Sequence, residues 1–240
     1  MSTSSHPVGL QLSKGLAAGI ATVATLGLLS GGFTLGVLAT HGFSAGSATA
    51  GTTPTTTPTA TTGTPTTASG PFVTGATVNW HTPLETLAGQ PTTLARGSKG
   101  TIIMAMASWC LYCGYEDKWV LPVLAKTPGV VVDIVDVSPQ GGIADPGPQS
   151  PAFSGHDGTG GALTVAGMAS TMQQYVKAFG TLSASNIHVY VAPTTTQTAW
   201  NIQSFPSLAF VGANGTVAVA PGGAQTLSQA QADVHQALGS

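Results

Sequence analysis

The stretch Ala107-Ser108-Trp109-Cys110-Leu111-Tyr112-Cys113-Gly114 decides how this chain is interpreted, because it holds the only two cysteines among 240 residues. An apolar, strand-like run at 101–106 comes directly before it, and a segment with helical spacing follows it. A Cys-x-x-Cys pair at a strand-to-helix junction places the first sulfur at a helix N-terminus, where unpaired N–H groups and the helix dipole favour a thiolate. The second sulfur then lies one turn further on. The sequence therefore predicts a cysteine pair that exchanges disulfides.

Two other roles are open to the cysteine pair. A zinc site needs about four ligands, and the six histidines of the chain are isolated from one another and from the cysteines. We therefore predict no metal and no cofactor. A purely structural disulfide stays open as an alternative, although so small a ring removes little chain entropy and stabilises a fold weakly.

A second landmark is Pro206, which stands directly before the apolar run 207–211. A central strand should not contain proline, so Pro206 is expected to begin this strand, with a cis peptide bond after Phe205 as one way of doing so. A glycine-containing turn at 213–215, a short strand at 217–220 and a helix at 226–238 are expected to complete the chain.

The N-terminal part of the chain is expected to be a membrane anchor and a tether. Residues 15–39 run 25 residues without a charge, which exceeds the ~20 that a membrane-spanning helix needs. That length favours an uncleaved signal-anchor, while the tripeptide at 48–50 leaves signal-peptide cleavage open. With Lys14 as the nearest charge, residues 1–14 are expected in the cytoplasm and the rest outside the cell membrane. Residues 40–71, rich in Thr and Pro, are expected to be a disordered linker, and 72–240 a single domain.

These features together resemble a known family. Trp-Cys-x-x-Cys, followed about ninety residues later by a strand-opening proline, a glycine turn, a strand and a helix, resembles the thioredoxin superfamily. Ala-Ser-Trp-Cys-x-x-Cys behind a membrane anchor is similar, more narrowly, to the TlpA/ResA-type thiol-disulfide oxidoreductases. The resemblance implies a thioredoxin-like α/β fold over residues ~75–240, with a central mixed β-sheet flanked by helices.

The resemblance also assigns roles. Cys110 would be the nucleophile and Cys113 the resolving cysteine, with Trp109 shielding them and Leu111 and Tyr112 tuning the reduction potential. Pro206, in the cis form, would lie against the sulfurs and leave the Phe205 backbone free to pair with an extended substrate. The implied partners are protein thiols and disulfides, together with a membrane electron-transfer partner. One departure is Met104, which occupies the place where many thioredoxins carry a buried Asp that relays protons.

Hydrophobic patterning predicts the remaining elements of the domain. Strands are expected at 76–80, 92–95, 101–107, 129–137 and 186–192, helices at 112–126, 167–179 and 194–202, and a long loop at 138–166. Pro122 is expected to kink the first helix. Glu116 and Asp117 are assigned to its solvated face, with a role as proton acceptor for Cys113 as the alternative. Asp133 and Asp136 are expected at the end or on an exposed face of their strand, with a metal role left open.

The charge content narrows the possible partners and environments. Six Lys and Arg and eight Asp and Glu among 240 residues are too few and too scattered to bind nucleic acid, which needs clustered basic side chains. So low a charge is consistent with a strongly acidic surrounding medium, and retained activity near pH 3 is the corresponding test.

Two classes of function follow from the sequence. The first is an extracytoplasmic, membrane-anchored thiol-disulfide oxidoreductase. The alternative is a non-catalytic binding or chaperone module on the same fold, in which the cysteines are a structural pair or carry a metal. Neither the direction of electron flow nor the substrate proteins follow from these residues.

Overall fold

The computed structural model describes residues 70–239. The predicted anchor at 15–39 and all but the last two residues of the predicted linker at 40–71 lie outside these described residues. Between residues 70 and 239, no helix has the length and apolar character needed to cross a membrane.

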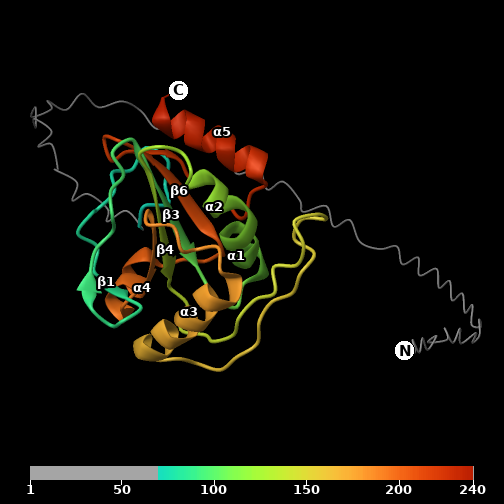
Figure 1. The fold of residues 1–240 in the computed structure, drawn as a ribbon. Helices are drawn as coiled ribbons and strands as arrows, with labels where there is room; N and C mark the ends of the chain where they lie inside the picture. Colours follow the sequence, from blue (N-terminus) through green and yellow to red (C-terminus); the bar gives the residue numbers. More distant parts are fainter. Residues whose placement is uncertain (1–69, 240) are drawn as a thin grey trace, which may run out of the picture. The chain divides into compact units, whose positions relative to one another are not determined.

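One mixed sheet forms the centre of the described domain (Figure 1). Its strands are β1 (Leu84–Thr86), β2 (Pro91–Thr92), β3 (Gly100–Met106), β4 (Val130–Asp136), β5 (Ile187–Val191), β6 (Ser207–Gly212) and β7 (Val217–Val219). The strand order is β2-β1-β5-β4-β3-β6-β7. β3 pairs in parallel with β4 and antiparallel with β6, and β4 pairs in parallel with β5. Two successive β-α-β units therefore make the parallel part of the sheet.

Helices cover both faces of this sheet. They are α1 (Leu111–Tyr115), the π-helical turn η1 (Glu116–Val120), α2 (Leu121–Leu124), α3 (Val165–Phe179), α4 (Thr194–Trp200) and α5 (Leu227–Leu238). One apolar cluster joins the side chains of α1, α2, α3 and α5 to the even-numbered residues of β3. A second cluster joins Trp200 of α4 and the residues before β1 to the odd-numbered residues of β3. Because side chains alternate across a strand, these two clusters lie on opposite faces of the sheet.

The helix that follows the cysteine motif contains a π turn just before its proline. α1, η1 and α2 follow one another without a break, and the Leu121 N–H donates to the Glu116 carbonyl, five residues back. Pro122 has no N–H, and its ring would clash with the carbonyl of the residue four positions earlier in a regular α-helix. The wider turn relieves this clash. The sequence predicts a kink at Pro122; the structure shows one π-helical turn directly before it.

Several predicted elements are confirmed, one does not form and one is displaced. The strands expected at 101–107, 129–137 and 186–192 are β3, β4 and β5, and the helices expected at 167–179, 194–202 and 226–238 are α3, α4 and α5. The strand expected at 76–80 does not form. The strand expected at 92–95 is displaced, since only Thr92 belongs to β2, which makes a short hairpin with β1 at 84–92. Of the region 76–80, only Thr77 makes an isolated bridge, to Thr216.

The prediction for the two aspartates of β4 is confirmed in one respect and wrong in another: Asp136 ends the strand, but neither side chain lies on an exposed face. Asp133 and Asp136 have no exposed surface, and Asp133 lies in the middle of the strand. Asp133 accepts a hydrogen bond from the Ala95 N–H (2.8 Å), and Asp136 accepts one from the Ser138 N–H (3.0 Å). Main-chain donors from neighbouring loops therefore allow both carboxyl groups to be buried. Within residues 70–239, no three His, Cys, Asp or Glu side chains gather closely enough to hold a metal ion.

The predicted loop at 138–166 is confirmed, and it has a defined form. Its two arms are bridged at Gln140 and Ala162 and again at Asp145 and His156. The arms approach so closely that a Cβ on Gly155 would lie 1.9 Å from the Asp145 carbonyl oxygen. Glycine is therefore required at this crossing, and we call residues 138–164 the two-armed loop.

Candidate active site

The two cysteines sit where β3 passes into α1. Cys110 is the N-cap residue of α1, and its Sγ accepts a hydrogen bond from the Cys113 N–H at 3.3 Å. Both cysteines are free thiols; Cys110 is 3% exposed, and Cys113 is fully buried. The sulfur of Cys110 is thus the one nearer to solvent, at the helix end where backbone donors are directed toward it.

The pKa values of the two thiols are shifted in opposite directions. A hydrogen bond from the Cys113 side chain, helped by the backbone N–H groups of Cys113 and Tyr112, lowers the pKa of Cys110 despite its burial. Burial raises the pKa of Cys113 well above its usual range, and the neighbouring Cys110 and Asp117 raise it further. Cys110 is therefore the thiol that ionises first, as a nucleophile requires, and Cys113 holds its proton.

The other residues singled out from the sequence lie around this pair. The Phe205–Pro206 peptide bond is cis, and it leads into β6, which pairs with β3 so that Ser207 faces Ala105 near the motif end of that strand. The rings of Trp109 and Phe205 meet edge to face, with centroids 5.9 Å apart. Leu111 is partly buried and Tyr112 is 47% exposed. The roles assigned to these residues stay predictions.

Glu116 and Asp117 are buried, so their assignment to a solvated helix face was wrong. Asp117 has no exposed surface, and its Oδ2 accepts a hydrogen bond from the Tyr175 hydroxyl at 2.6 Å. Its other oxygen, Oδ1, has no hydrogen-bond partner among the described residues. Burial raises the pKa of Asp117 to about 7, in spite of the hydrogen bond from Tyr175. A carboxyl group with a free oxygen therefore lies four residues beyond Cys113, close enough for its charge to affect that thiol.

Glu116 makes a different contact. Its Oε1 accepts a hydrogen bond from the Gln225 N–H, just before α5, while Oε2 has no partner among residues 70–239. Burial raises the pKa of Glu116 to about 8. Glu116 thus ties the motif helix to the segment before α5, whereas Asp117 turns toward α3 and the cysteines.

The two-armed loop is fastened directly to the motif. The Ala144 N–H donates to the Ser108 carbonyl (3.0 Å), and the Gly158 N–H donates to the Trp109 carbonyl (2.7 Å). From the motif side, Trp109 Nε1 donates to Ser138 Oγ (3.0 Å). These bonds hold the loop over the start of α1 and help to explain why Cys110 is so little exposed.

Sequence patterns could not identify all of the residues that gather here. Tyr175 occurs on the apolar stripe of α3, which indicates burial but no partner. Asp157 lies in the two-armed loop, where no periodicity exists, yet its Oδ1 accepts a hydrogen bond from the Leu111 N–H at 2.8 Å. Only the folded loop brings this carboxylate to the motif.

Two hollows of the described domain lie away from the cysteine motif. One of about 450 Å³ is lined by residues before β1 and by α4, and another of about 350 Å³ lies between α2 and α5. Neither is lined by Cys110 or Cys113.

Among known proteins, the chain is similar only to solved structures. No protein-family profile and no curated protein matches the chain. A putative electron transfer protein from Aquifex aeolicus VF5 is 12% identical, with 70% of this chain and 100% of that chain covered and a TM-score of 0.50. A secreted Mycobacterium tuberculosis disulfide oxidoreductase is 18% identical (65% and 95% covered, TM-score 0.44). A thiol:disulfide interchange protein of the thioredoxin family from Chlorobium tepidum is 19% identical (65% and 94% covered, TM-score 0.42).

Proposed function

Since residues 70–239 have a thioredoxin-like fold, we propose that this protein is a thiol-disulfide oxidoreductase that acts on other proteins through Cys110 and Cys113. The observation that supports this most strongly is the pairing of a low-pKa thiol at a helix N-terminus with a buried, high-pKa thiol one turn away. A purely structural cysteine pair has no need of this difference.

In the reducing direction, the Cys110 thiolate attacks one sulfur of a substrate disulfide. A bond forms between Cys110 and that sulfur, and the other substrate sulfur leaves as a thiolate that takes a proton from water. Cys113 then attacks Cys110, so that the Cys110–Cys113 disulfide forms and the second substrate thiolate is released. Two electrons have passed to the substrate, and the reverse sequence oxidises a substrate dithiol.

The second step requires Cys113 to lose its proton inside the protein. Met104 is fully buried in the apolar core and cannot accept it. Asp117 has an unpartnered oxygen and a pKa raised to about 7, so it is suited to take a proton near neutral pH and to return it later. Asp117, positioned by Tyr175, is therefore the proposed proton acceptor for Cys113.

Replacing Asp117 by asparagine is expected to slow the resolution of the mixed disulfide by about 100-fold, the usual contribution of a general base. Asparagine keeps the shape and a hydrogen-bond acceptor for Tyr175 but cannot take a proton. The measurement is the decay of a preformed mixed disulfide between Cys110 and a peptide thiol, followed at several pH values.

The matched control is Asp133→Asn, because Asp133 is an equally buried carboxyl group whose partner is the Ala95 N–H and not a residue near the cysteines. It should resolve the mixed disulfide at the wild-type rate. Equal decay rates in wild type and Asp117→Asn would remove Asp117 from the mechanism.

The proposed function is tested by the redox equilibrium of the full-length protein in glutathione and dithiothreitol buffers. A reversible two-electron transition between Cys110 and Cys113 is expected. A potential near or below about −250 mV would mark a reductase, and one above about −150 mV an oxidase, on the scale where thioredoxin lies near −270 mV. The absence of any reversible transition would favour the binding-module alternative.

We further propose that the catalytic domain lies outside the cytoplasm and is held at the cell membrane by residues 15–39. Support comes from the 25-residue uncharged run in the sequence. A membrane electron-transfer partner would then supply or remove electrons. Fractionation of cells, with protease added from outside, tests the orientation, since only an external domain is digested in intact cells.

A further inference from the structure

The carboxylate of Asp157 lies at the beginning of the motif helix. Its Oδ1 accepts the Leu111 N–H at 2.8 Å, the first helical N–H after Cys110. The Cys110 sulfur receives the N–H of Cys113 at 3.3 Å. One of the backbone donors that normally favour a thiolate at this position is therefore taken by a carboxylate.

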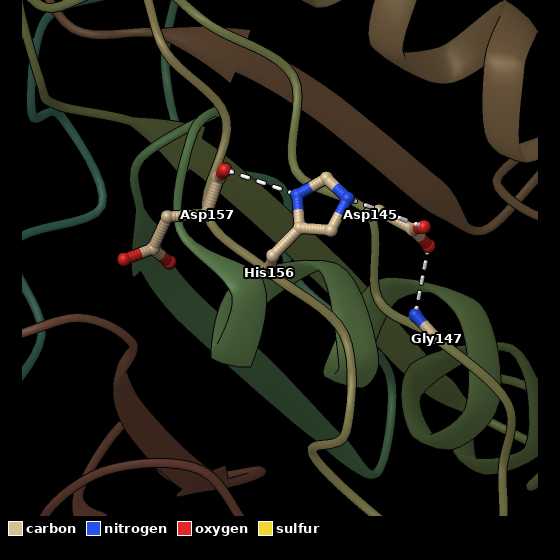
Figure 2. A network of polar contacts seen from close by, with 4 residues as sticks. All are labelled: Asp145, Gly147, His156 and Asp157. Atoms are coloured by element: carbon tan, nitrogen blue, oxygen red, sulfur yellow. Dashed lines mark hydrogen bonds and ion pairs between the residues drawn. The ribbon is translucent and has the colours of Figure 1, made fainter. Parts of the chain in front are cut away.

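The main chain around Asp157 is fixed on both sides, as Figure 2 shows in part. His156 lies within 3.6 Å of the Asp145 carboxylate through Nε2, and its Nδ1 is 3.2 Å from the Asp157 carbonyl oxygen. On the next residue, the Gly158 N–H donates to the Trp109 carbonyl. A Cβ on Gly158 would come within 2.5 Å of the Ile143 backbone, so the opposite arm is in direct contact here. The Asp157 side chain thus extends from a segment with little freedom to shift.

The charge of this carboxylate opposes that of a thiolate at Cys110. Asp157 acts against the other influences on Cys110 and raises its pKa, whereas the contacts from Cys113 and Tyr112 lower it. From α3, Tyr175 is also within electrostatic range of Cys110. The titratable side chains of these packed elements are Tyr112, Cys113, Tyr115, Glu116, Asp117 and Lys118 on the motif helix, Tyr175 and Lys177 on α3, and Asp145, His156 and Asp157 on the two-armed loop.

We propose that Asp157 is a positioning residue that caps the motif helix and holds a negative charge beside the Cys110 sulfur, so that the thiolate is less favoured and the cysteine pair is more reducing. This rests on the proposed oxidoreductase function and adds the element that tunes it. Destabilising the thiolate weakens the reduced form relative to the disulfide. The two-armed loop therefore covers the motif and, through the Asp157 side chain, also makes the Cys110 thiolate less stable.

The test replaces Asp157 by asparagine, which keeps an oxygen acceptor for the Leu111 N–H and removes the charge. Full-length reduced protein is alkylated with iodoacetamide over a range of pH, and the modified cysteine is located by mass spectrometry. The midpoint of the Cys110 rate profile is expected to move down by about half a pH unit, or about threefold in the ionisation equilibrium. Increasing salt should reduce the difference between the two proteins, because Asp157 is exposed to solvent.

The same variant is then equilibrated with oxidised and reduced glutathione. In this reaction one dithiol and one oxidised glutathione give one protein disulfide and two reduced glutathiones. Because the thiolate is more favoured in Asp157→Asn, its equilibrium constant for disulfide formation should be lower by a similar factor. Asp157→Ala, which lacks both the charge and the acceptor, should change both measurements in the same direction if the charge is responsible.

The control is Asp145→Asn, a carboxylate of the same loop that contacts His156 and the Gly147 N–H and not the motif (Figure 2). Its alkylation profile should match that of wild type. An unchanged profile in Asp157→Asn, or an equal change in Asp145→Asn, would overturn the proposal. Failure of the oxidoreductase function would appear separately, as the absence of a reversible disulfide with glutathione in wild type as well, while the alkylation profiles would still report on Asp157.

Discussion

Replacement of Cys110 by serine is expected to abolish disulfide reduction, with the rate of insulin reduction falling on the order of a thousandfold or more, to the uncatalysed background. Serine keeps the size and polarity of the N-cap side chain, so the start of α1 should be preserved. What is lost is the cysteine sulfur with the lowered pKa, and the remaining thiol, Cys113, is fully buried and has a raised pKa.

Cys113→Ser supplies the matched comparison. Its Cys110 can still attack a substrate disulfide but cannot be resolved by a second thiol, so a mixed disulfide with the substrate should accumulate. The two variants thus separate the roles of the sulfurs, one by loss of the first step and the other by loss of the second. Full insulin reduction by Cys110→Ser would contradict the enzyme proposal and favour the binding module.

The second large effect concerns stability: the folded state is expected to be most stable in mild acid and to weaken as pH rises from about 5 to 8. Four of the eight acidic residues have no exposed surface, and burial raises their pKa values to about 7 for Asp117 and about 8 for Glu116, Asp133 and Asp136. None has a Lys or Arg partner within residues 70–239. In the unfolded chain these groups would titrate near 4.

The sign follows from proton binding. Between about pH 4 and 8 the folded protein holds protons on these carboxyl groups that the unfolded chain has released, so stability decreases as pH rises. If the folded protein binds two more protons than the unfolded chain, the free energy of unfolding decreases by about 3 kcal/mol per pH unit. His188 acts in the opposite sense, because burial lowers its pKa and the unfolded chain binds its proton more readily near pH 6. Because one histidine is outnumbered by four carboxyl groups, stability is still expected to decrease as pH rises.

Urea unfolding of the full-length protein at constant ionic strength, from pH 4.5 to 8.5, measures this dependence. Asp133→Asn should reduce the slope by up to about 1.4 kcal/mol per pH unit, since it removes one of the protons that are exchanged. Asp145→Asn, an exposed control, should leave the slope unchanged. A stability that increases from pH 5 to 7.5 would contradict the expectation. A fold that is favoured by low pH would suit the acidic surroundings suggested by the low charge content.

The sequence was sufficient for the parts of the fold that depend on local patterns. The run that became β3 is apolar on both faces, as central strands are, and the spacing in α3 and α5 indicated which side each helix buries. The thioredoxin-like fold was predicted from the motif and Pro206, and the structure confirms it. The prediction for the segment before β1 failed because this segment has no repeated apolar pattern that would distinguish a strand from a loop.

The buried acids show what local patterns miss. Adjacent helical residues point about 100° apart, so the burial of both Glu116 and Asp117 needs partners on two sides. Those partners, Gln225 and Tyr175, are 109 and 58 residues away along the chain. Asp133 likewise depends on a main-chain donor 38 residues away. A carboxyl group can be assigned to the interior only when such donors are known.

The close crossing of the two loop arms has a consequence for how this sequence can diverge. At Gly155 and Gly158 the opposite backbone fills the space that any β-carbon would need. Selection on related genes should therefore hold these two positions fixed while the exposed positions between and around them drift. In an alignment, such invariant glycines in a variable, turn-rich segment would identify proteins that carry the same cover over their cysteines, even where little other similarity survives.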